Sequence, residues 1–273
     1  MQTIIAPIDF SPQARNAAVY AAQLAKTFNA RLILFHAYML PTPVSEVPYV
    51  MVTVDELQQE NENYLKKEAE HLEALYGIQT QRIVRIGIPS DEIKQLAEEE
   101  NPDLVVMGMK GQGGIDKIIG STTINAIRKT NSSVLVIPHD AVYAPLNSIT
   151  FAWDVNDSLN EELAHPLPLI ARNYHSDIHI INIEKQQEKD FTAVEKGRLA
   201  FDRLFENITH EYITVSDPSV MHGLNSYMER QTSDLLVMIA HKHSFLDRVF
   251  SRDRTTEMAH ETRIPLLILR HRQ

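Results

Sequence analysis

The sequence predicts an α/β protein built from two similar halves, each a mainly parallel sheet with helices on both faces. Two observations lead to this prediction. Short apolar runs alternate with longer stretches of helical periodicity, as expected for strands joined by right-handed crossover helices. Several of these runs recur after roughly half the chain, so an internal repeat is the simplest account.

The predicted strands of the first half are near-continuous apolar runs, which is typical of parallel strands covered on both faces. They span residues 3–9, 31–38, 79–87, 103–109 and 133–138. The helices between them span residues 10–28, 53–77, 89–101 and 121–130. Ser11 is placed to cap the first helix, with Pro12 in its first turn. Gly77 ends the second helix, and Ser90 is predicted to cap the third.

The second half repeats this order less cleanly. Matching segments are 4–11 with 149–156, 29–38 with 176–184, 103–111 with 234–243, and 132–138 with 264–270. The first pair aligns Asp9 with Asp154. Pro166 and Pro168 are predicted to interrupt or kink the helix that takes the place of the first one. We predict two domains, 1–144 and 145–273.

Composition limits the function classes. The net charge of −10 disfavours general binding to nucleic acid or to an anionic membrane. The absence of cysteine excludes disulfides, thiolate zinc sites and cysteine nucleophiles. No apolar run approaches the roughly 20 residues that span a bilayer, and the first residues do not resemble a signal peptide. We expect a cytoplasmic location.

Five of the nine glycines lie between residues 105 and 123. Glycine permits positive φ and lets a ligand approach the backbone. If the first and fourth strands are neighbours, Asp9 and Gly108 face one crevice beyond the strand ends. The loop leads to Gly120 and Ser121 at a helix start, where free N–H groups and the helix dipole suit phosphates.

This pattern favours an anion site, to which Lys110 and Lys117 could add positive charge. It matches neither a Walker A loop nor a Rossmann fingerprint, because the lysine is missing from the helix start and the loop follows the fourth strand. The alternative is a flexible surface turn. Asp9 likewise has an alternative role, as an acid that ends the first strand in a turn or caps the next helix.

The arrangement resembles the universal stress protein family, in its tandem form with two domains in one chain. The family's nucleotide motif reads glycine, two residues, glycine, nine residues, then glycine and serine or threonine. Gly108, Gly111, Gly120 and Ser121 match it, with eight residues in the long gap. The resemblance covers essentially the whole chain and is stronger in residues 1–140.

The resemblance implies two flavodoxin-like (Rossmann-like) domains, each with a five-stranded parallel sheet, packed as a pseudo-dimer through the strands near 133–138 and 264–270. It also implies an adenine nucleotide, ATP or another, with or without magnesium. A homo-oligomer and an unidentified protein partner are further expectations. The nucleotide-binding residues that it implies are Pro7, Ile8, Asp9, Ala37, Met107, Gly108, Gly111, Gly120, Ser121, Thr122 and Thr123.

Three functions remain open. The first is a non-catalytic, ATP-binding stress-response regulator, with any hydrolysis slow. The second is an adenylating enzyme, which the glycine-free segment after the first strand, DFSPQA, disfavours. The third is a nucleotide-free scaffold. No catalytic residue and no metal site is predicted.

The second half lacks the glycines of the loop. The repeat aligns Gly108 with Ala240 and Gly111 with His243, so side chains are expected where backbone would meet phosphate. Trp153 stands where Ile8 does and is interpreted as filling the space of a base. His241 and His243 could ligate a metal, but Lys242 between them disfavours a cation. We predict one nucleotide per chain.

Overall fold

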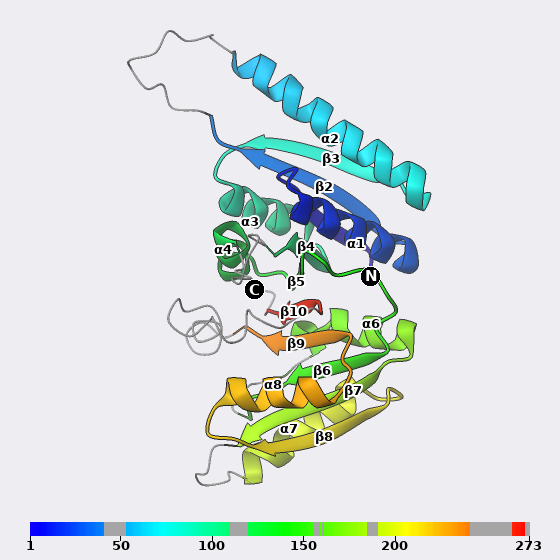
Figure 1. Cartoon of the computed structure of the whole chain (residues 1–273), viewed down its shortest axis with the longest axis vertical. Helices are drawn as coiled ribbons and strands as arrows, with labels where there is room; N and C mark the ends of the chain where they lie inside the picture. The colour runs from blue at the N-terminus through cyan, green and yellow to red at the C-terminus, as the bar shows by residue number, and fades with distance from the viewer. Residues whose placement is uncertain are drawn as a thin grey trace.

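The computed structural model describes residues 1–40, 53–109, 120–155, 159, 161–184, 191–240 and 264–270. Within these residues, ten strands form one continuous sheet in the order β3-β2-β1-β4-β5-β10-β9-β6-β7-β8. The sheet runs along the length of the molecule, and β10, red in Figure 1, lies in the middle beside β5. The fold is thus the predicted α/β type.

Both halves of the sheet have the same strand order, read outward from the middle. In the first half the strands are β1 (Thr3–Pro7), β2 (Arg31–Tyr38), β3 (Thr80–Ile86), β4 (Leu104–Gly108) and β5 (Val134–Ile137). In the second they are β6 (Ser148–Ala152), β7 (Asp177–Glu184), β8 (His210–Ser216), β9 (Leu235–Ile239) and β10 (Leu266–Leu269). All pairs are parallel except β5 with β10, which is antiparallel. The expected neighbours β1 and β4 are confirmed.

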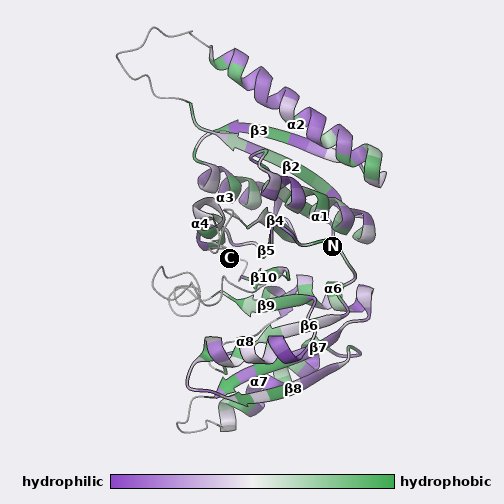
Figure 2. Cartoon of the chain, viewed as in Figure 1, coloured by the Kyte–Doolittle hydropathy of each residue, from purple (hydrophilic) through white to green (hydrophobic). Residues whose placement is uncertain are grey.

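Helices cover both faces of the sheet. One face packs against α1 (Pro12–Phe28), α2 (Val54–Tyr76), α5 (Glu161–Ala164), α6 (Pro166–Tyr174) and α7 (Phe191–Leu204). The other packs against α3 (Pro89–Glu100), α4 (Ser121–Lys129) and α8 (Val220–Arg230). Figure 2 shows that α2 is largely hydrophilic, in keeping with its few buried residues. No helix in the described ranges is long and apolar enough to cross a membrane.

Three of the four predicted helix signals are confirmed, and one of them is Pro12, at which α1 begins. The Ser11 hydroxyl accepts a hydrogen bond from the Ala14 N–H at 3.3 Å, and Gly77 ends α2 with φ of 66°. The Ser90 cap is wrong. Because Pro89 occupies the start of α3, the N-cap falls on Ile88 and Ser90 lies buried inside the first turn.

The predicted interruption by proline is also confirmed. The helix stops at Ala164 and restarts at Pro166, with His165 as the break. Pro168 does not add a second break, because it lies in the first turn of α6, where its missing N–H removes no hydrogen bond within the helix.

The two halves meet along β5 and β10 and through side chains around them. Leu135 pairs with Leu267 in the antiparallel register, and both are buried. The Tyr143 hydroxyl lies 2.7 Å from the Thr27 hydroxyl on α1 and 2.5 Å from the Tyr174 hydroxyl on α6. These contacts leave neither apolar terminal strand as an exposed edge.

Equivalent hydrogen bonds occur in both halves. The Asp103 carboxylate accepts the N–H groups of Gln2 and Thr3 at 2.5 and 3.0 Å. Asp234 accepts the N–H groups at the start of β6, those of Asn147 and Ser148, both at 2.9 Å. Each aspartate therefore fixes the start of the neighbouring parallel strand.

Asp103 should make the stability of the protein depend on acid pH. Burial alone would raise the pKa of its carboxyl. The Gln2 and Thr3 donors, together with His165 at 3.5 Å and the terminal amine, lower the pKa below its usual value instead. The stabilisation is complete above the unfolded pKa of about 3.9 and is lost as the pH falls through the lower folded value.

We expect Asp103→Asn to flatten this loss, because its amide oxygen still accepts both N–H groups but carries no charge. The measurement is urea denaturation of both proteins between pH 6 and pH 3. Asp177→Asn, at an exposed position, is the control. Equal slopes for the wild type and Asp103→Asn would contradict the assignment.

Candidate functional site

The candidate site lies at the carboxyl ends of β1 and β4. These strands pair directly, so the chain leaves both at the same edge of the sheet, where the strand order reverses. Asp9 follows β1, and Gly108 ends β4. The two residues that the sequence predicted to face one crevice are therefore at neighbouring strand ends.

Asp9 is exposed and closes the turn between β1 and α1. Its Oδ1 accepts hydrogen bonds from the Ser11 N–H at 3.1 Å and the Ser11 hydroxyl at 2.5 Å. Phe10 between them has φ of 61°, a left-handed conformation. Of the two alternative roles left open for Asp9, the structure shows the turn, because Ser11 and not Asp9 is the N-cap of α1. The turn fixes the carboxylate at the edge of the sheet.

Gly108 is required by close packing against α1. A Cβ atom at this position would lie 2.6 Å from the Gln13 carbonyl oxygen, which belongs to the backbone and cannot rotate away. The Gly108 carbonyl also accepts a hydrogen bond from the Thr123 hydroxyl at 3.2 Å. This bond ties the end of β4 to the first turn of α4.

The first turn of α4 presents its N–H groups to the loop side. Gly120 is the N-cap and, having no side chain, leaves them uncapped. Ser121 and Thr122 are exposed, whereas Thr123 is buried. Free N–H groups, two exposed hydroxyls and the positive end of the helix dipole form an arrangement that can bind an anion.

An aromatic cluster that the sequence analysis missed borders Asp9. The Phe10 ring lies 4.5 Å from the His36 ring and 5.7 Å from the Tyr64 ring on α2. The His36 Nδ1 lies 2.7 Å from the Ile8 carbonyl oxygen and must carry a proton, since that oxygen can only accept. No local pattern predicts this cluster, because its rings come from segments that lie far apart in the sequence.

The other predicted residues fall into four groups. Ala37 is half-buried in β2, paired with Arg85. Ile8 and Met107 are buried in opposite layers of the core, so only their backbone could meet a ligand. Pro7 ends β1. The remaining loop residues, Lys110, Gly111, Gly113, Gly114 and Lys117, lie outside the described residues.

The alignment of Gly108 with Ala240 is wrong by one residue. The Met109 N–H donates to the last residue of β5, and the Ala240 N–H donates to the last residue of β10. Met109 and Ala240 are therefore equivalent, and Gly108 corresponds to Ile239, which is buried. In the first half, the backbone of α1 packs directly against Gly108. In the second half, the equivalent position carries the large apolar side chain of Ile239.

Trp153 corresponds to Ile8, because each donates its N–H to the second strand of its half. Its ring is buried and packs on α7, where a Cβ at Gly197 would lie 2.0 Å from it. Phe201 contacts the same ring edge-on, with centroids 5.3 Å apart. The position equivalent to Ile8 is therefore part of the hydrophobic core in the second half.

The rest of the second loop, including His241, Lys242 and His243, lies outside the described residues. Across the residues that are described, no group of three or more histidine and acidic side chains could hold a metal ion.

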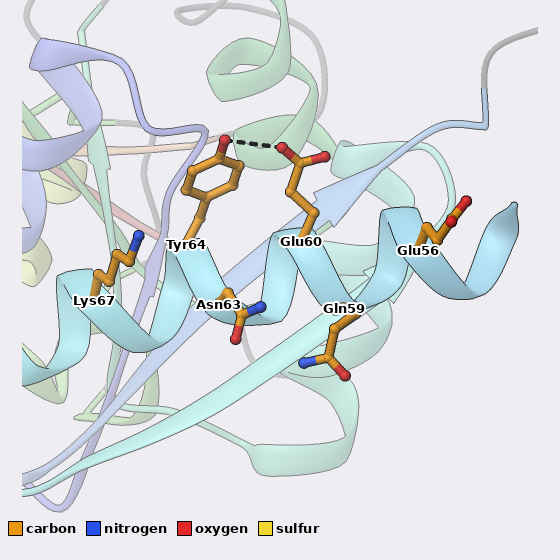
Figure 3. Close-up of a pocket in the computed structure, with 6 residues that line it drawn as sticks. All are labelled: Glu56, Gln59, Glu60, Asn63, Tyr64 and Lys67. Carbon is orange, nitrogen blue, oxygen red and sulfur yellow. Dashed lines mark hydrogen bonds between the residues drawn. The ribbon is translucent and has the colours of Figure 1, made fainter. Parts of the chain in front are cut away.

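A shallow hollow on the outer face of α2 is a poorer candidate (Figure 3). All of its lining side chains project from this single helix, and Tyr64 donates a hydrogen bond to Glu60 at 2.9 Å. The lining residues are Glu56, Gln59, Glu60, Asn63, Tyr64 and Lys67. The side chains are mostly acidic or amide groups on a solvent-facing helix surface. Apart from Tyr64 and Glu60, they do not point toward one another, so they do not form a binding site.

Gly108→Ala should destabilise the protein by about 1–3 kcal/mol, because the added methyl group forces the start of α1 to move. Gly87→Ala is the matched control. There the added Cβ meets only the flexible end of the Glu92 side chain, so a change within about 0.5 kcal/mol is expected. Urea denaturation measures both, and equal effects would show that α1 does not require this glycine.

Comparisons with known proteins agree with this geometry. The sequence model of the universal stress protein family matches residues 1–138. Universal stress protein Sll1654 of Synechocystis is 32% identical over 138 residues, 50% of this chain and 85% of that protein. Universal stress protein MJ0577 of Methanocaldococcus jannaschii is 36% identical over 94 residues, 31% of this chain and 57% of that protein.

Solved structures also resemble the chain over nearly its whole length. One of them is a universal stress protein from Archaeoglobus fulgidus, which covers 99% of this chain and 98% of its own, with a TM-score of 0.77 and 17% identity. At that identity the likeness concerns the fold. It extends the match in fold over the second half, which the family model does not reach.

Proposed function

The chain belongs to the universal stress protein family, and we propose that its first half binds one adenine nucleotide as a non-catalytic stress-response regulator. In this proposal residues 1–144 form the nucleotide-binding domain and residues 145–273 a degenerate domain of the same kind. ATP is the nucleotide that the family resemblance favours. The protein would act in the cytoplasm through a protein partner.

One observation carries the proposal: the Thr123–Gly108 hydrogen bond holds the uncapped first turn of α4 at the end of β4. β4 lies directly beside β1, whose end carries Asp9. An uncapped helix start, which can bind an anion, and a fixed carboxylate thus stand at neighbouring strand ends. A nucleotide has the matching chemistry, with phosphates at one end and base amino or ring N–H donors at the other.

Different residues of the site would bind the two ends of the nucleotide. The N–H groups and hydroxyls of Ser121 and Thr122 would bind phosphate oxygens. Asp9 would accept a hydrogen bond from the base, beside the Phe10 ring. A magnesium ion accompanying the phosphates would be held mainly by their oxygens, since Mg²⁺ commonly keeps water and phosphate ligands.

A regulatory role suits this site better than catalysis. A phosphoryl-transfer site needs groups that orient a nucleophile and neutralise developing charge. Asp9 already accepts two hydrogen bonds from Ser11, which lowers its value as a general base. Occupancy would therefore act by stabilising one conformation or one complex, with any hydrolysis slow.

A nucleotide-free scaffold is the second candidate. Its support is that packing against α1 alone accounts for Gly108, and that the turn between β1 and α1 alone accounts for Asp9. The two functions differ in one observable property, the presence of a bound nucleotide.

The test is to denature the purified protein, identify released nucleotide by mass spectrometry, and measure ATP binding to stripped protein by calorimetry. We expect a released adenine nucleotide and a saturable ATP isotherm. Stripped, folded protein that binds no adenine nucleotide would establish the scaffold instead.

A further inference from the structure

Arg270 links the second half of the chain to a helix of the first half. It directly follows β10, and its Nη1 donates a hydrogen bond to the Ile127 carbonyl oxygen in α4. Ile127 lies in the last turn of that helix, where carbonyl groups have no partner within the helix. The guanidinium thus satisfies an acceptor that α4 itself cannot.

Charge and burial strengthen this contact. Arg270 is partly buried, and burial lowers its pKa from the usual value, although a guanidinium stays charged. A cation at a helix C-terminus also meets the negative end of the helix dipole. In the same turn, Lys129 donates to the Ser90 hydroxyl at 3.2 Å and pairs with Asp91 of α3. The C-terminal turn of α4 is therefore fixed twice, by Arg270 after β10 and by the contacts of its own Lys129 with α3.

At the equivalent position, the first half has no hydrogen bond like that of Arg270. The last residues of β5 and β10 are equivalent, since each accepts the N–H that follows the neighbouring strand. The residue after β5 is Pro138, which has neither a charge nor a donor. The first half therefore offers no counterpart to Arg270 at this position.

We infer that Arg270 is a positioning residue for the phosphate end of the candidate nucleotide site. The inference rests on the proposed function. Helix α4 has nine residues, which makes it a rigid rod of about 13 Å. Holding its C-terminal turn orients the opposite turn, where Ser121 and Thr122 would bind phosphate. The second half thereby sets the nucleotide affinity of the first.

The experiment compares ATP with adenosine in the full-length chain. Arg270→Met keeps the apolar stem and removes the donors. We expect it to weaken ATP binding about tenfold, while adenosine, which lacks phosphates, binds within about twofold of the wild type. Arg270→Lys retains a cationic donor and should recover much of the ATP affinity. Arg172→Met, at an exposed position in the last turn of α6, should change neither affinity.

Hydrogen exchange of the α4 amides, measured without nucleotide, separates this inference from the proposed function. Arg270→Met should speed exchange in residues 124–130 at least about threefold and leave α1 unchanged. Unchanged exchange in α4, or equal losses for ATP and adenosine, would overturn the inference. If the wild type binds no nucleotide, the proposed function fails, and with it the role of Arg270 in affinity; the exchange result still decides whether Arg270 fixes α4.

Discussion

Ser121→Glu is expected to weaken ATP binding about 100-fold or more while leaving the protein at least as stable as the wild type. The new carboxylate would stand in the first turn of α4, where phosphate is proposed to bind, and like charges brought together are strongly unfavourable. The same carboxylate meets the positive end of the helix dipole, so stability should rise by up to about 1 kcal/mol. Calorimetry and urea denaturation measure the two effects.

Ser121→Gln separates charge from size at this position. Its side chain has nearly the same volume as glutamate but no charge, so ATP affinity should fall by less than about tenfold. Position 121 is exposed, and neither variant disturbs the core. If both variants weakened ATP binding equally, the loss would be steric, and the helix start would not be an anion site.

Phe201→Ala should destabilise the protein by about 3–5 kcal/mol, the effect expected for truncating a large aromatic side chain in a core. Phe201 is 0% exposed, and four rings surround it. Its neighbours, with centroid distances of 5.1 to 6.2 Å, are Phe151, Trp153, Phe205 and Tyr212. In this cluster α7 packs against Trp153, which is why we regard the second half as a structural domain without a nucleotide.

Leu199→Ala is the control on the same helix. Leu199 is 54% exposed, so its truncation should change the free energy of unfolding by about 0.5 kcal/mol or less. Thermal and urea denaturation give both values. A loss below 1 kcal/mol for Phe201→Ala would show that the second half does not depend on this cluster.

Most of the fold could be predicted because local signals and global arrangement agree. Apolar strands, a serine cap at Ser11 and a glycine stop at Gly77 each reflect the physics of a few neighbouring residues. The helix break before Pro166 belongs to the same class. The repeat then implied that β5 and β10 have equivalent places, which the strand order reproduces.

Most of the omissions share a different cause, which is contact between distant residues, whereas the Ser90 error is local. Serine is a common N-cap residue, but the helix already begins at Pro89, so the N-cap is Ile88, two positions before Ser90. Gly108 was assigned to a ligand, yet the backbone of α1 also requires it. Neither the ring contact of His36 with Phe10 nor the reach of Arg270 to α4 leaves a signal in local sequence.

The stoichiometry of ATP binding tests the central claim most directly. A nucleotide is proposed to bind beside Asp9 and α4, whereas in the second half the positions equivalent to Ile8 and Gly108 carry the buried side chains of Trp153 and Ile239. Native mass spectrometry of the stripped chain, titrated with ATP at physiological salt, should show a single bound nucleotide per chain. Two nucleotides per chain, or one that persists in Ser121→Glu combined with Asp9→Ala, would contradict it.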